Sequence, residues 1–327
     1  MTNNEILSLN KKGLFRVQDA APMFSTNNVN FPAGLLAQLS PVVVENILAK
    51  RSGEEVAGSR RKVLDWADED FYIPLIERTG GTTPYSDFGQ SRVAGINPTF
   101  ERGGHYRFSV SLNIGNLEEE QLAKAKINAY DYKMSAAGEA LEVEANRAAF
   151  EGYISNSSNA YLCYGILNHP NLPAYTAAAK QFSAMTYDEL MAFFAGAVAK
   201  LTTQTGNQIN VNSKIRVAIA SDAFAYLAGL VTTFGYSALE GLKKAYPNME
   251  FVSTYEFNGA YNSQNVIYFI GESVAGGVAE TLELGYSELM RQSNVVVEHE
   301  FRSQQISSGV TGAIVYKPLF IVRYNNI

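Results

Sequence analysis

Apolar and polar residues alternate along residues 105–114, where apolar side chains occupy every second position. Because successive side chains of a strand point to opposite faces, this pattern predicts a strand with one apolar face. A partner strand is expected over residues 71–76, with Pro74 at a sheet edge. The stretch between the two segments is rich in Gly and in other turn-forming residues. The two segments therefore predict a hairpin with a long, irregular tip.

This hairpin needs a surface outside itself. Two strands joined by a long tip are not stable alone in water. We therefore interpret the hairpin as a clasp that reaches onto another copy of the chain. Changes at Gly80 or Gly81 in its tip are expected to spare folding of the subunit and to impair assembly.

A helical pattern follows the hairpin over residues 117–154. Asn116 is the expected N-cap, and the glutamates that follow it complement the positive end of the helix dipole. One continuous helix of this length would span about 55 Å. Its apolar stripe consists mainly of small side chains, which would let another element approach the backbone closely. The stripe residues are Leu122, Ala125, Ala129, Tyr132, Ala136, Ala140, Val143, Phe150 and Ile154, with Arg147 interrupting the series.

From about residue 156 to residue 277 the chain alternates helices and strands. Thr186 and Glu189 form a capping-box pattern that opens a helix reaching about Thr202. Ser221 or Asp222 is expected to cap the next helix. A third helix is expected over residues 237–245, with strands over 215–220, 251–255 and 266–270. This order predicts a compact α/β unit, and further strands are expected over residues 295–301, 312–316 and 319–324.

Residues 1–62 mix Asn, Ser, Gly and charged residues with short apolar patches. Ser40 and Pro41 suit the N-cap and the first turn of a helix that Gly53 would end. The remainder of this segment is expected to become ordered only against a partner surface. The sequence as a whole therefore predicts an α+β building block with an extended arm.

Composition narrows the classes of function. The 327 residues carry a net charge of −6, which argues against a protein whose main task is to grip nucleic acid. The basic triplet Arg60, Arg61 and Lys62 is interpreted as a solvated loop, and the single Cys163 cannot form an intrachain disulfide. The chain starts without a secretory signal pattern, and no apolar run approaches the ~20 residues of a membrane helix. We therefore expect a protein that is soluble and intracellular at synthesis, with no membrane partner.

Candidate catalytic residues are few. Ser273 follows a predicted strand, but a nucleophile elbow has Gly where Ala275 stands. The only downstream base, His299, is expected within another strand. A simple tight turn is therefore favoured over a Ser273–His299 hydrolase. Cys163 lies among apolar neighbours, as an inert core thiol does.

Metal and nucleotide sites find no support either. The histidines His105, His169 and His299 show no metal-ligand spacing and are assigned structural roles. The acidic group around residues 65–70 lacks the ligand alternation and central Gly of a calcium loop, so it is interpreted as a solvated turn. No phosphate-binding Gly-rich loop is present. We predict no enzyme activity, no cofactor, and no catalytic, cofactor-binding or metal-binding residue. The acidic group around residues 65–70 consists of Asp65, Asp68, Glu69 and Asp70.

The order of these elements resembles the major capsid proteins of tailed bacteriophages, which have the HK97-like fold. The segment Gly165-Ile-Leu-Asn-His-Pro170 is similar to a Gly-Leu-Leu-Asn-His-Pro-like motif that follows the spine helix in one branch of these proteins. Residues 309–318, with the strand that follows them, resemble the closing strands of the family. In element order, the resemblance covers nearly the whole chain.

The resemblance implies a division of the chain. Residues 1–65 correspond to an N-terminal arm, and residues 66–116 to the extended loop, or E-loop. The peripheral domain would comprise residues 117–160, with the spine helix, together with residues 278–327. The axial domain would comprise residues 161–277 and would cluster around the fivefold and sixfold positions of a shell. The short arm leaves no room for an in-chain scaffolding segment, so a separate scaffold or none is expected.

The resemblance also implies a function and partners. The chain would be a structural subunit that assembles with itself, as hexamers and pentamers, into the icosahedral head enclosing double-stranded DNA. Scaffolding protein, portal and decoration proteins would be further partners, and contact with the packaged DNA would be non-specific. The subunit would reside in the virion, and in the host cytoplasm during assembly. An encapsulin-type bacterial nanocompartment, which encloses an enzyme, is the alternative with the same fold; a serine hydrolase is the alternative of another class.

Overall fold

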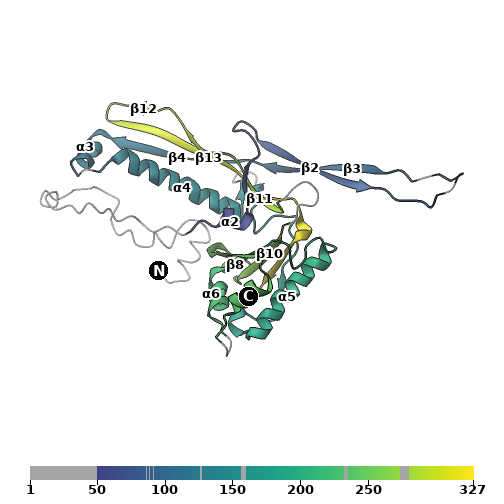
Figure 1. Ribbon diagram of the computed structural model, residues 1–327. Helices are drawn as coiled ribbons and strands as arrows, with labels where there is room; N and C mark the ends of the chain where they lie inside the picture. Colours follow the sequence, from purple (N-terminus) through teal and green to yellow (C-terminus); the bar gives the residue numbers. More distant parts are fainter. Residues whose placement is uncertain are drawn as a thin grey trace.

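The computed structural model describes residues 50–85, 87, 89–90, 92–125, 127–155, 160–231, 235–272 and 280–327. The helix predicted to begin at Ser40, most of the arm and Ser273 lie outside these residues. The described chain has two sheeted bodies and a long hairpin that projects from one of them (Figure 1). The first described helix is α2 (Gly53–Ala57), so Gly53 begins a helix and does not end one.

The first body is a five-stranded sheet. β13 (Phe301–Val315) is its central strand and pairs with β4 (Tyr106–Gly115) in a continuous antiparallel register from Val310–Tyr106 to Phe301–Gly115. Two strands pair with the other edge of β13, namely β11 (Leu282–Gln292) and the short β12 (Val296–Val297). β1 (Arg60–Lys62) runs parallel to β11. The basic triplet is therefore an edge strand, and its interpretation as a loop was wrong.

The long helix is divided into two. α3 (Asn116–Lys124) and α4 (Ala129–Glu151) are separate, and the Asn128 side chain accepts a hydrogen bond from the Tyr130 backbone N–H as the cap of α4. The prediction of one helix over residues 117–154 was therefore wrong. A side-chain cap in mid-segment satisfies N–H groups that a continuous helix would have paired internally, so it marks a new start. With 23 residues, α4 extends about 35 Å.

α4 lies along β4 and β13 (Figure 1), and its buried face agrees with the predicted stripe at Ala129 and Phe150 but not in between. Ala137 and Leu141 are buried, and they pack with Leu112, Ile114 and Ile306 of the sheet. Of the predicted stripe, Tyr132, Ala136 and Ala140 are exposed. The two apolar series lie one position apart along the helix, so the periodicity of the sequence did not distinguish the face that the sheet covers.

The hairpin is formed by β2 (Asp70–Thr79) and β3 (Gly95–Gly104), in register from Asp70–Gly104 to Thr79–Gly95. The predicted return strand over residues 105–114 is β4 and belongs to the first sheet, so its assignment to the hairpin was wrong. Its alternation was interpreted correctly, since Leu112 and Ile114 face the core while Ser111 and Asn113 are exposed. β4 carries an apolar face that α4 covers, and β3 does not.

The second body is an α/β unit with a mixed five-stranded sheet in the order β7-β14-β10-β8-β9. β8 and β10 lie at its centre and are buried along their whole length. The capping box predicted at Thr186 and Glu189 is present, with both reciprocal hydrogen bonds. The strands are β7 (Thr176–Ala177), β14 (Ile321–Asn325), β10 (Val266–Gly271), β8 (Ile215–Ala220) and β9 (Met249–Thr254), and the helices are α5 (Tyr187–Gln204), α6 (Ser221–Gly229) and α7 (Ala238–Ala245).

Two further local predictions were wrong, one at α6 of the α/β unit and one at β12 of the first sheet. α6 begins directly after β8 with Ala220 at the N-cap position and no side-chain cap; the Asn258 side chain instead accepts a hydrogen bond from the Asp222 N–H. The expected strand over residues 295–301 is only the two-residue β12, followed by a turn into β13. His299 lies in that turn and is exposed.

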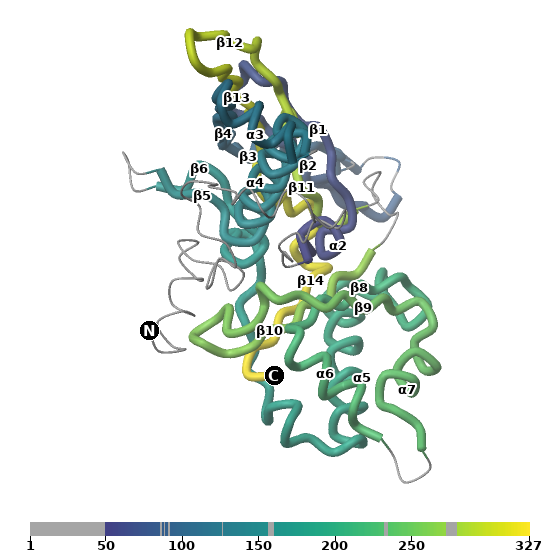
Figure 2. The backbone as a smooth tube through the Cα atoms, turned by 90° about the vertical axis from the view of Figure 1, so that its left-hand side faces the viewer, coloured from purple at the N-terminus to yellow at the C-terminus, as the bar shows by residue number. Residues whose placement is uncertain are grey.

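The C-terminal strand joins the α/β unit. β14 follows the 3-10 turn Pro318–Phe320 and pairs antiparallel with β10. A division that assigns all of residues 278–327 to the first body therefore differs from the sheet pairing at this strand. In the view of Figure 2, the two bodies lie one above the other, with α2 between them. The remaining short strands, β5 (Tyr153–Ile154) and β6 (Tyr161–Cys163), pair beside the end of α4.

Candidate assembly surfaces

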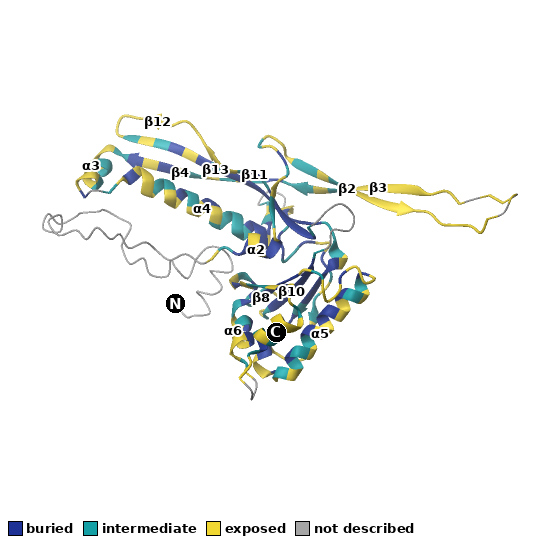
Figure 3. Ribbon diagram, viewed as in Figure 1, coloured by how far each residue is buried: buried dark blue, intermediate teal, exposed yellow. Residues whose placement is uncertain are grey.

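The hairpin β2–β3 presents a wide apolar face to solvent. Tyr72 is 62% exposed, Ile76 60%, and Phe100 65%, although all three lie within regular strands. Figure 3 shows the hairpin as the most continuously exposed part of the described chain. Solitary exposed apolar residues are common on soluble proteins, but a contiguous set marks a surface that another molecule covers. We define the apolar face of the hairpin as Tyr72, Pro74, Ile76, Ile96, Pro98 and Phe100.

A second exposed apolar group lies at the opposite end of the first body. It is formed by the end of β11 and by β12, and Val297 is its most exposed member. This group lies far from the hairpin along the first sheet (Figure 1). The subunit therefore presents apolar side chains at both ends of its long axis. The members of this group are Leu289, Met290, Val295, Val296 and Val297.

The root of the hairpin is held by His105, between β3 and β4. Its Nδ1 lies 2.8 Å from the Asp68 carbonyl oxygen and its Nε2 lies 2.8 Å from Ser287 Oγ. Burial lowers the pKa of His105 below its ordinary value. A neutral ring that donates from Nδ1 and accepts at Nε2 satisfies both contacts. His105 thus has the structural role expected for it, although it lies between the strands and opens neither.

The acidic residues near the hairpin root are engaged by neighbouring groups of the chain. Asp65 pairs with Lys62 at 2.8 Å, and Asp70 pairs with Arg102 at 2.7 Å. The Asp68 side chain accepts the Asp65 backbone N–H. Within the described residues, no group of three or more His, Cys, Asp and Glu side chains converges. These carboxylates therefore pair with nearby basic side chains or accept a backbone N–H.

Residues 165–170 connect the end of α4 to the α/β unit. Asn168 bridges this turn, because its Oδ1 accepts the Gly165 N–H at 2.7 Å and its Nδ2 donates to the Glu151 carbonyl. The Leu167 N–H donates to the Phe150 carbonyl at 3.0 Å. A Cβ at Gly165 would lie 2.2 Å from that same oxygen. The turn therefore requires glycine and satisfies the last carbonyls of the helix.

The same turn is tied to the first sheet through Tyr164. Its carbonyl oxygen accepts the Ala313 N–H at 2.8 Å, where β13 passes closely at Gly312. Gly312 has φ +74°, and a Cβ there would lie 2.2 Å from the Tyr164 oxygen. His169 packs edge-on to the Tyr164 ring, and burial lowers the pKa of His169 to about 4. His169 is therefore a neutral packing residue in this junction.

Arg323 of β14 holds the next residues of the chain from the α/β side. Its Nε donates to the Pro173 carbonyl at 2.6 Å, and its guanidinium lies 4.1 Å from the centre of the Tyr175 ring. The Tyr268 hydroxyl is 3.3 Å from its Nη1. A buried cation is tolerated when carbonyl dipoles and an aromatic face replace water around it. The last strand thus fixes the connection between the two bodies.

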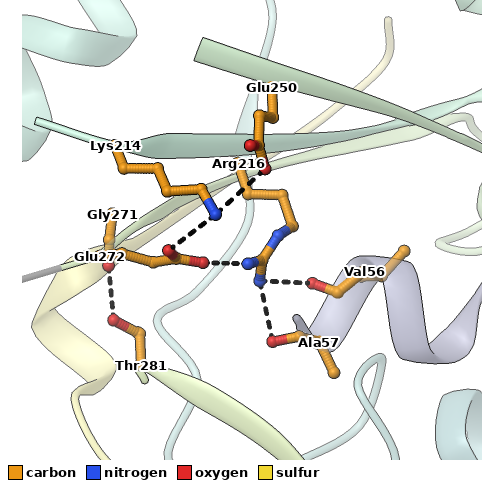
Figure 4. Close-up of polar contacts among 8 residues, drawn as sticks. All are labelled: Val56, Ala57, Lys214, Arg216, Glu250, Gly271, Glu272 and Thr281. Atoms are coloured by element: carbon orange, nitrogen blue, oxygen red, sulfur yellow. Dashed lines mark hydrogen bonds and ion pairs between the residues drawn. The ribbon is translucent and has the colours of Figure 1, made fainter. Parts of the chain in front are cut away.

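Arg216 of β8 connects α2 to the α/β unit (Figure 4). Its side chain is almost fully buried, and it forms an ion pair with Glu272, which directly follows β10. Its Nη1 also donates to the Ala57 carbonyl at 2.9 Å, at the end of α2. Lys214 lies 3.4 Å from Glu272 and 3.3 Å from Glu250. This charged cluster anchors the chain where the N-terminal segment enters the fold.

Sequence reasoning missed both buried arginines. Each interrupts an otherwise apolar strand, at Ile215-Arg-Val in β8 and at Val322-Arg-Tyr in β14. A charged residue inside a strand that is apolar on both sides has to be paired or hydrogen-bonded if the strand is buried. That pattern was the available signal. The groups that pair with the two arginines come from segments far from them in the sequence.

The residues considered for catalysis are only partly described. Ser273 lies outside the described residues, and His299 is exposed in the turn between β12 and β13, not within a strand as expected. Cys163 is buried, and burial raises the pKa of its thiol to about 12, which keeps it protonated at neutral pH. No helix among the described residues is long and apolar enough to cross a membrane.

Comparisons with known proteins relate the chain to a family. The family described as Pa193 gp26 major capsid protein matches residues 22–326. The capsid of Myoviridae phage XM1 has a similar structure, with a TM-score of 0.74 at 13% identity, covering 90% of this chain and 98% of that one. The mature capsid of bacteriophage PhiM1 has a TM-score of 0.56 at 9% identity, with 88% and 90% covered. No curated protein matches.

These structural likenesses show an HK97-like fold, whereas the family match reaches across nearly the whole sequence. Such a family is structural and not enzymatic. It also selects the phage head over the encapsulin-type and hydrolase alternatives. The chain belongs to the Pa193 gp26 major capsid protein family and is a subunit of the virion shell of a tailed phage.

Proposed function

We propose that this subunit builds a closed icosahedral head from hexamers and pentamers of itself, and that the head encloses double-stranded DNA. The observation that carries the proposal is the apolar face of the hairpin, which no described residue covers. A two-stranded sheet that exposes such a face is stable only against another surface. Neighbouring subunits would supply that surface in a shell, and the described part of the chain does not.

The proposed division of labour follows the two bodies. The first sheet with α4 is the peripheral domain, the hairpin β2–β3 is the E-loop, and the α/β unit is the axial domain that surrounds the fivefold and sixfold positions. We assign β14 to the axial domain because it pairs with β10. Residues 165–170 and Arg216 then lie at the junction between the two domains, where they set the angle at which one domain meets the other.

Further partners follow from this role. Scaffolding protein, portal and decoration proteins would contact the shell, and assembly would take place in the host cytoplasm. Contact with packaged DNA is proposed to be non-specific. A net charge of −6 supports this, because a strongly basic wall would bind the DNA and hinder its packing.

The test is to express the full chain and to examine it by size-exclusion chromatography and negative-stain electron microscopy. Closed shells, or rings of five and six subunits, are the expected result. The nucleic acid inside any shell is measured from the absorbance ratio at 260 and 280 nm and by nuclease protection. A chain that remains a monomer or dimer, with candidate scaffolds and crowding agents added, would contradict the proposal.

A further inference from the structure

The chain holds a single Asn–Gly pair, Asn258–Gly259. The pair follows the 3-10 turn Tyr255–Phe257 and lies a few residues before β10. Asparagine followed by glycine is the dipeptide most prone to spontaneous deamidation, because glycine has no side chain to shield its backbone nitrogen or to restrict the turn that the reaction needs. This pair is therefore the place where a slow covalent change of the backbone is chemically easiest.

The reaction needs no enzyme and no cofactor. The backbone nitrogen of Gly259 attacks Cγ of Asn258, and the new N–Cγ bond closes a five-membered succinimide ring. The Cγ–Nδ2 bond breaks, and the amide leaves as ammonia with the proton of the Gly259 N–H. Water then opens the ring at either carbonyl, which gives aspartate or isoaspartate at position 258. Isoaspartate continues the main chain through its side chain and so adds one methylene to the backbone.

The fold holds Asn258 in a conformation from which this ring cannot close. Ring closure requires Cβ and the nitrogen of the next residue to eclipse each other about the Cα–C bond. An L-residue reaches that arrangement at a negative ψ, whereas ψ of Asn258 is +116°. The peptide group that follows must therefore rotate by roughly a third of a turn before its nitrogen can reach Cγ.

Asn265 opposes that rotation. The Gly259 N–H donates to Asn265 Oδ1 at 2.9 Å, so the nitrogen that would attack keeps its proton and is directed toward Asn265. Asn265 directly precedes β10, which is buried along its whole length, and the Tyr261 and Gln264 backbones pair across the turn before it. The acceptor is thus presented from a fixed part of the fold. Rotation of the peptide would break this hydrogen bond and leave a half-buried N–H without its acceptor.

Other elements hold the Asn258 side chain and the backbone before it. Asn258 Nδ2 donates to Ser221 Oγ at 2.8 Å, and its Oδ1 accepts the Asp222 N–H at 3.4 Å, both at the start of α6. Phe257 is fully buried and meets the Tyr268 ring of β10 at a centroid distance of 4.7 Å. The leaving amide, the attacking nitrogen and the preceding residue are therefore each held by a different contact.

We propose that Asn258 is the deamidation site of this chain, and that Asn265 is the positioning residue that suppresses the reaction in the folded subunit. The inference goes beyond the shell function and does not depend on it, because all of these contacts lie within one subunit. A methylene inserted at position 258 would shift Phe257, which packs in the core of the α/β unit. Suppression of the reaction therefore preserves the packing of that core.

The test follows deamidation at position 258 in unassembled subunits at mildly alkaline pH, by peptide mass spectrometry and enzymatic detection of isoaspartate. A free peptide of residues 254–262 gives the unprotected rate, and the wild type should react roughly tenfold or more slowly than it. Asn265→Ala should react roughly three- to tenfold faster than the wild type, because one hydrogen bond that opposes opening is lost. Asn265→Asp should stay close to the wild type, since its carboxylate still accepts the N–H.

Two controls separate this effect from a general loss of stability. Asn212 precedes a serine in an exposed turn, so its deamidation is an internal reference and should be equal in all variants. Leu141→Ala removes a buried side chain from the separate core cluster beneath α4. This variant lowers the stability of the subunit without touching the loop, and its rate at position 258 should stay near that of the wild type.

The proposal is overturned if the wild type deamidates at the rate of the peptide, if Asn265→Ala reacts no faster than the wild type, or if Leu141→Ala accelerates the reaction as much as Asn265→Ala does. Amide hydrogen exchange at Gly259 of the wild type needs no substitution and checks the same contact. An unprotected Gly259 amide would also overturn the proposal. None of these results bears on the shell function, which the assembly test decides separately.

Discussion

Phe150 is the residue at which the cost of a single truncation can be worked out most directly. It lies at the end of α4, is 1% exposed, and meets the Phe257 ring edge-on at a centroid distance of 5.9 Å. Phe257 follows β9 in the α/β unit, so this ring pair joins the two bodies. The Phe150 carbonyl also accepts the Leu167 N–H, and a substitution to Ala leaves that hydrogen bond in place. The Phe150→Ala change therefore tests the side chain alone.

The expected cost has two main parts. Burial of a phenylalanine side chain stabilises a fold by about 1.5–3 kcal/mol. The cavity left behind and the lost ring contact raise the total to about 3–5 kcal/mol. For a chain of 327 residues that unfolds as one unit, each kcal/mol lowers the melting temperature by about 1.5 °C, so the variant should melt roughly 4–7 °C below the wild type.

The measurement is urea unfolding of unassembled subunits, followed by circular dichroism. Phe100→Ala is the matched control, because the same side chain is removed from an exposed position on the hairpin. Its cost to subunit stability should stay within about 0.5 kcal/mol. The reasoning is refuted if Phe150→Ala costs under about 1 kcal/mol, or no more than Phe100→Ala does.

Three further predictions concern the junction between the bodies. Arg216→Met should destabilise the subunit by about 3–5 kcal/mol in urea unfolding, because Glu272 keeps a largely buried charge without its main partner. The double variant Arg216→Met, Glu272→Gln should recover part of this loss. No recovery would contradict the role of the ion pair. Gly312→Ala should yield little folded protein in a solubility and melting assay, because φ is +74° and the Tyr164 carbonyl occupies the space; a wild-type melting temperature would show that β13 adjusts freely. His169 has a folded pKa of about 4, below the ordinary 6.5, so its contribution to stability is complete above about pH 6.5 and is lost as the pH falls toward 4. The urea midpoint of His169→Gln should therefore fall less between pH 7 and pH 4.5 than that of the wild type, and parallel curves would refute this.

Local sequence signals predicted the features that can be recognised within a few consecutive residues. The Thr186–Glu189 capping box and the strand at residues 215–220 were read correctly, because a cap and a buried apolar run are visible in short windows. The alternation in β4 was also interpreted correctly. Its partner was not, since the hydrogen bonds of β4 go to β13, about 190 residues further along the chain.

The break in the long helix shows a limit of another kind. Residues 117–154 have a helical period throughout, and the restart at Asn128 rests on one side-chain hydrogen bond to Tyr130. In the middle of α4 the buried face was also misassigned by one position, whereas Ala129 and Phe150 were assigned correctly. Ala136 and Ala137 are equally apolar, so only the position of the sheet beneath the helix decides which of them is buried.

The sequence by itself determined that this chain is an α+β building block with an extended strand at residues 71–76, a long helical segment and an α/β unit. It did so because composition, turn residues and periodicity are local properties. The tertiary structure decided which strands pair, which face of α4 is covered, and which carbonyls receive Arg216 and Arg323. These contacts join segments that lie far apart in the sequence, and their energies depend on distances that exist only once the two bodies have packed together.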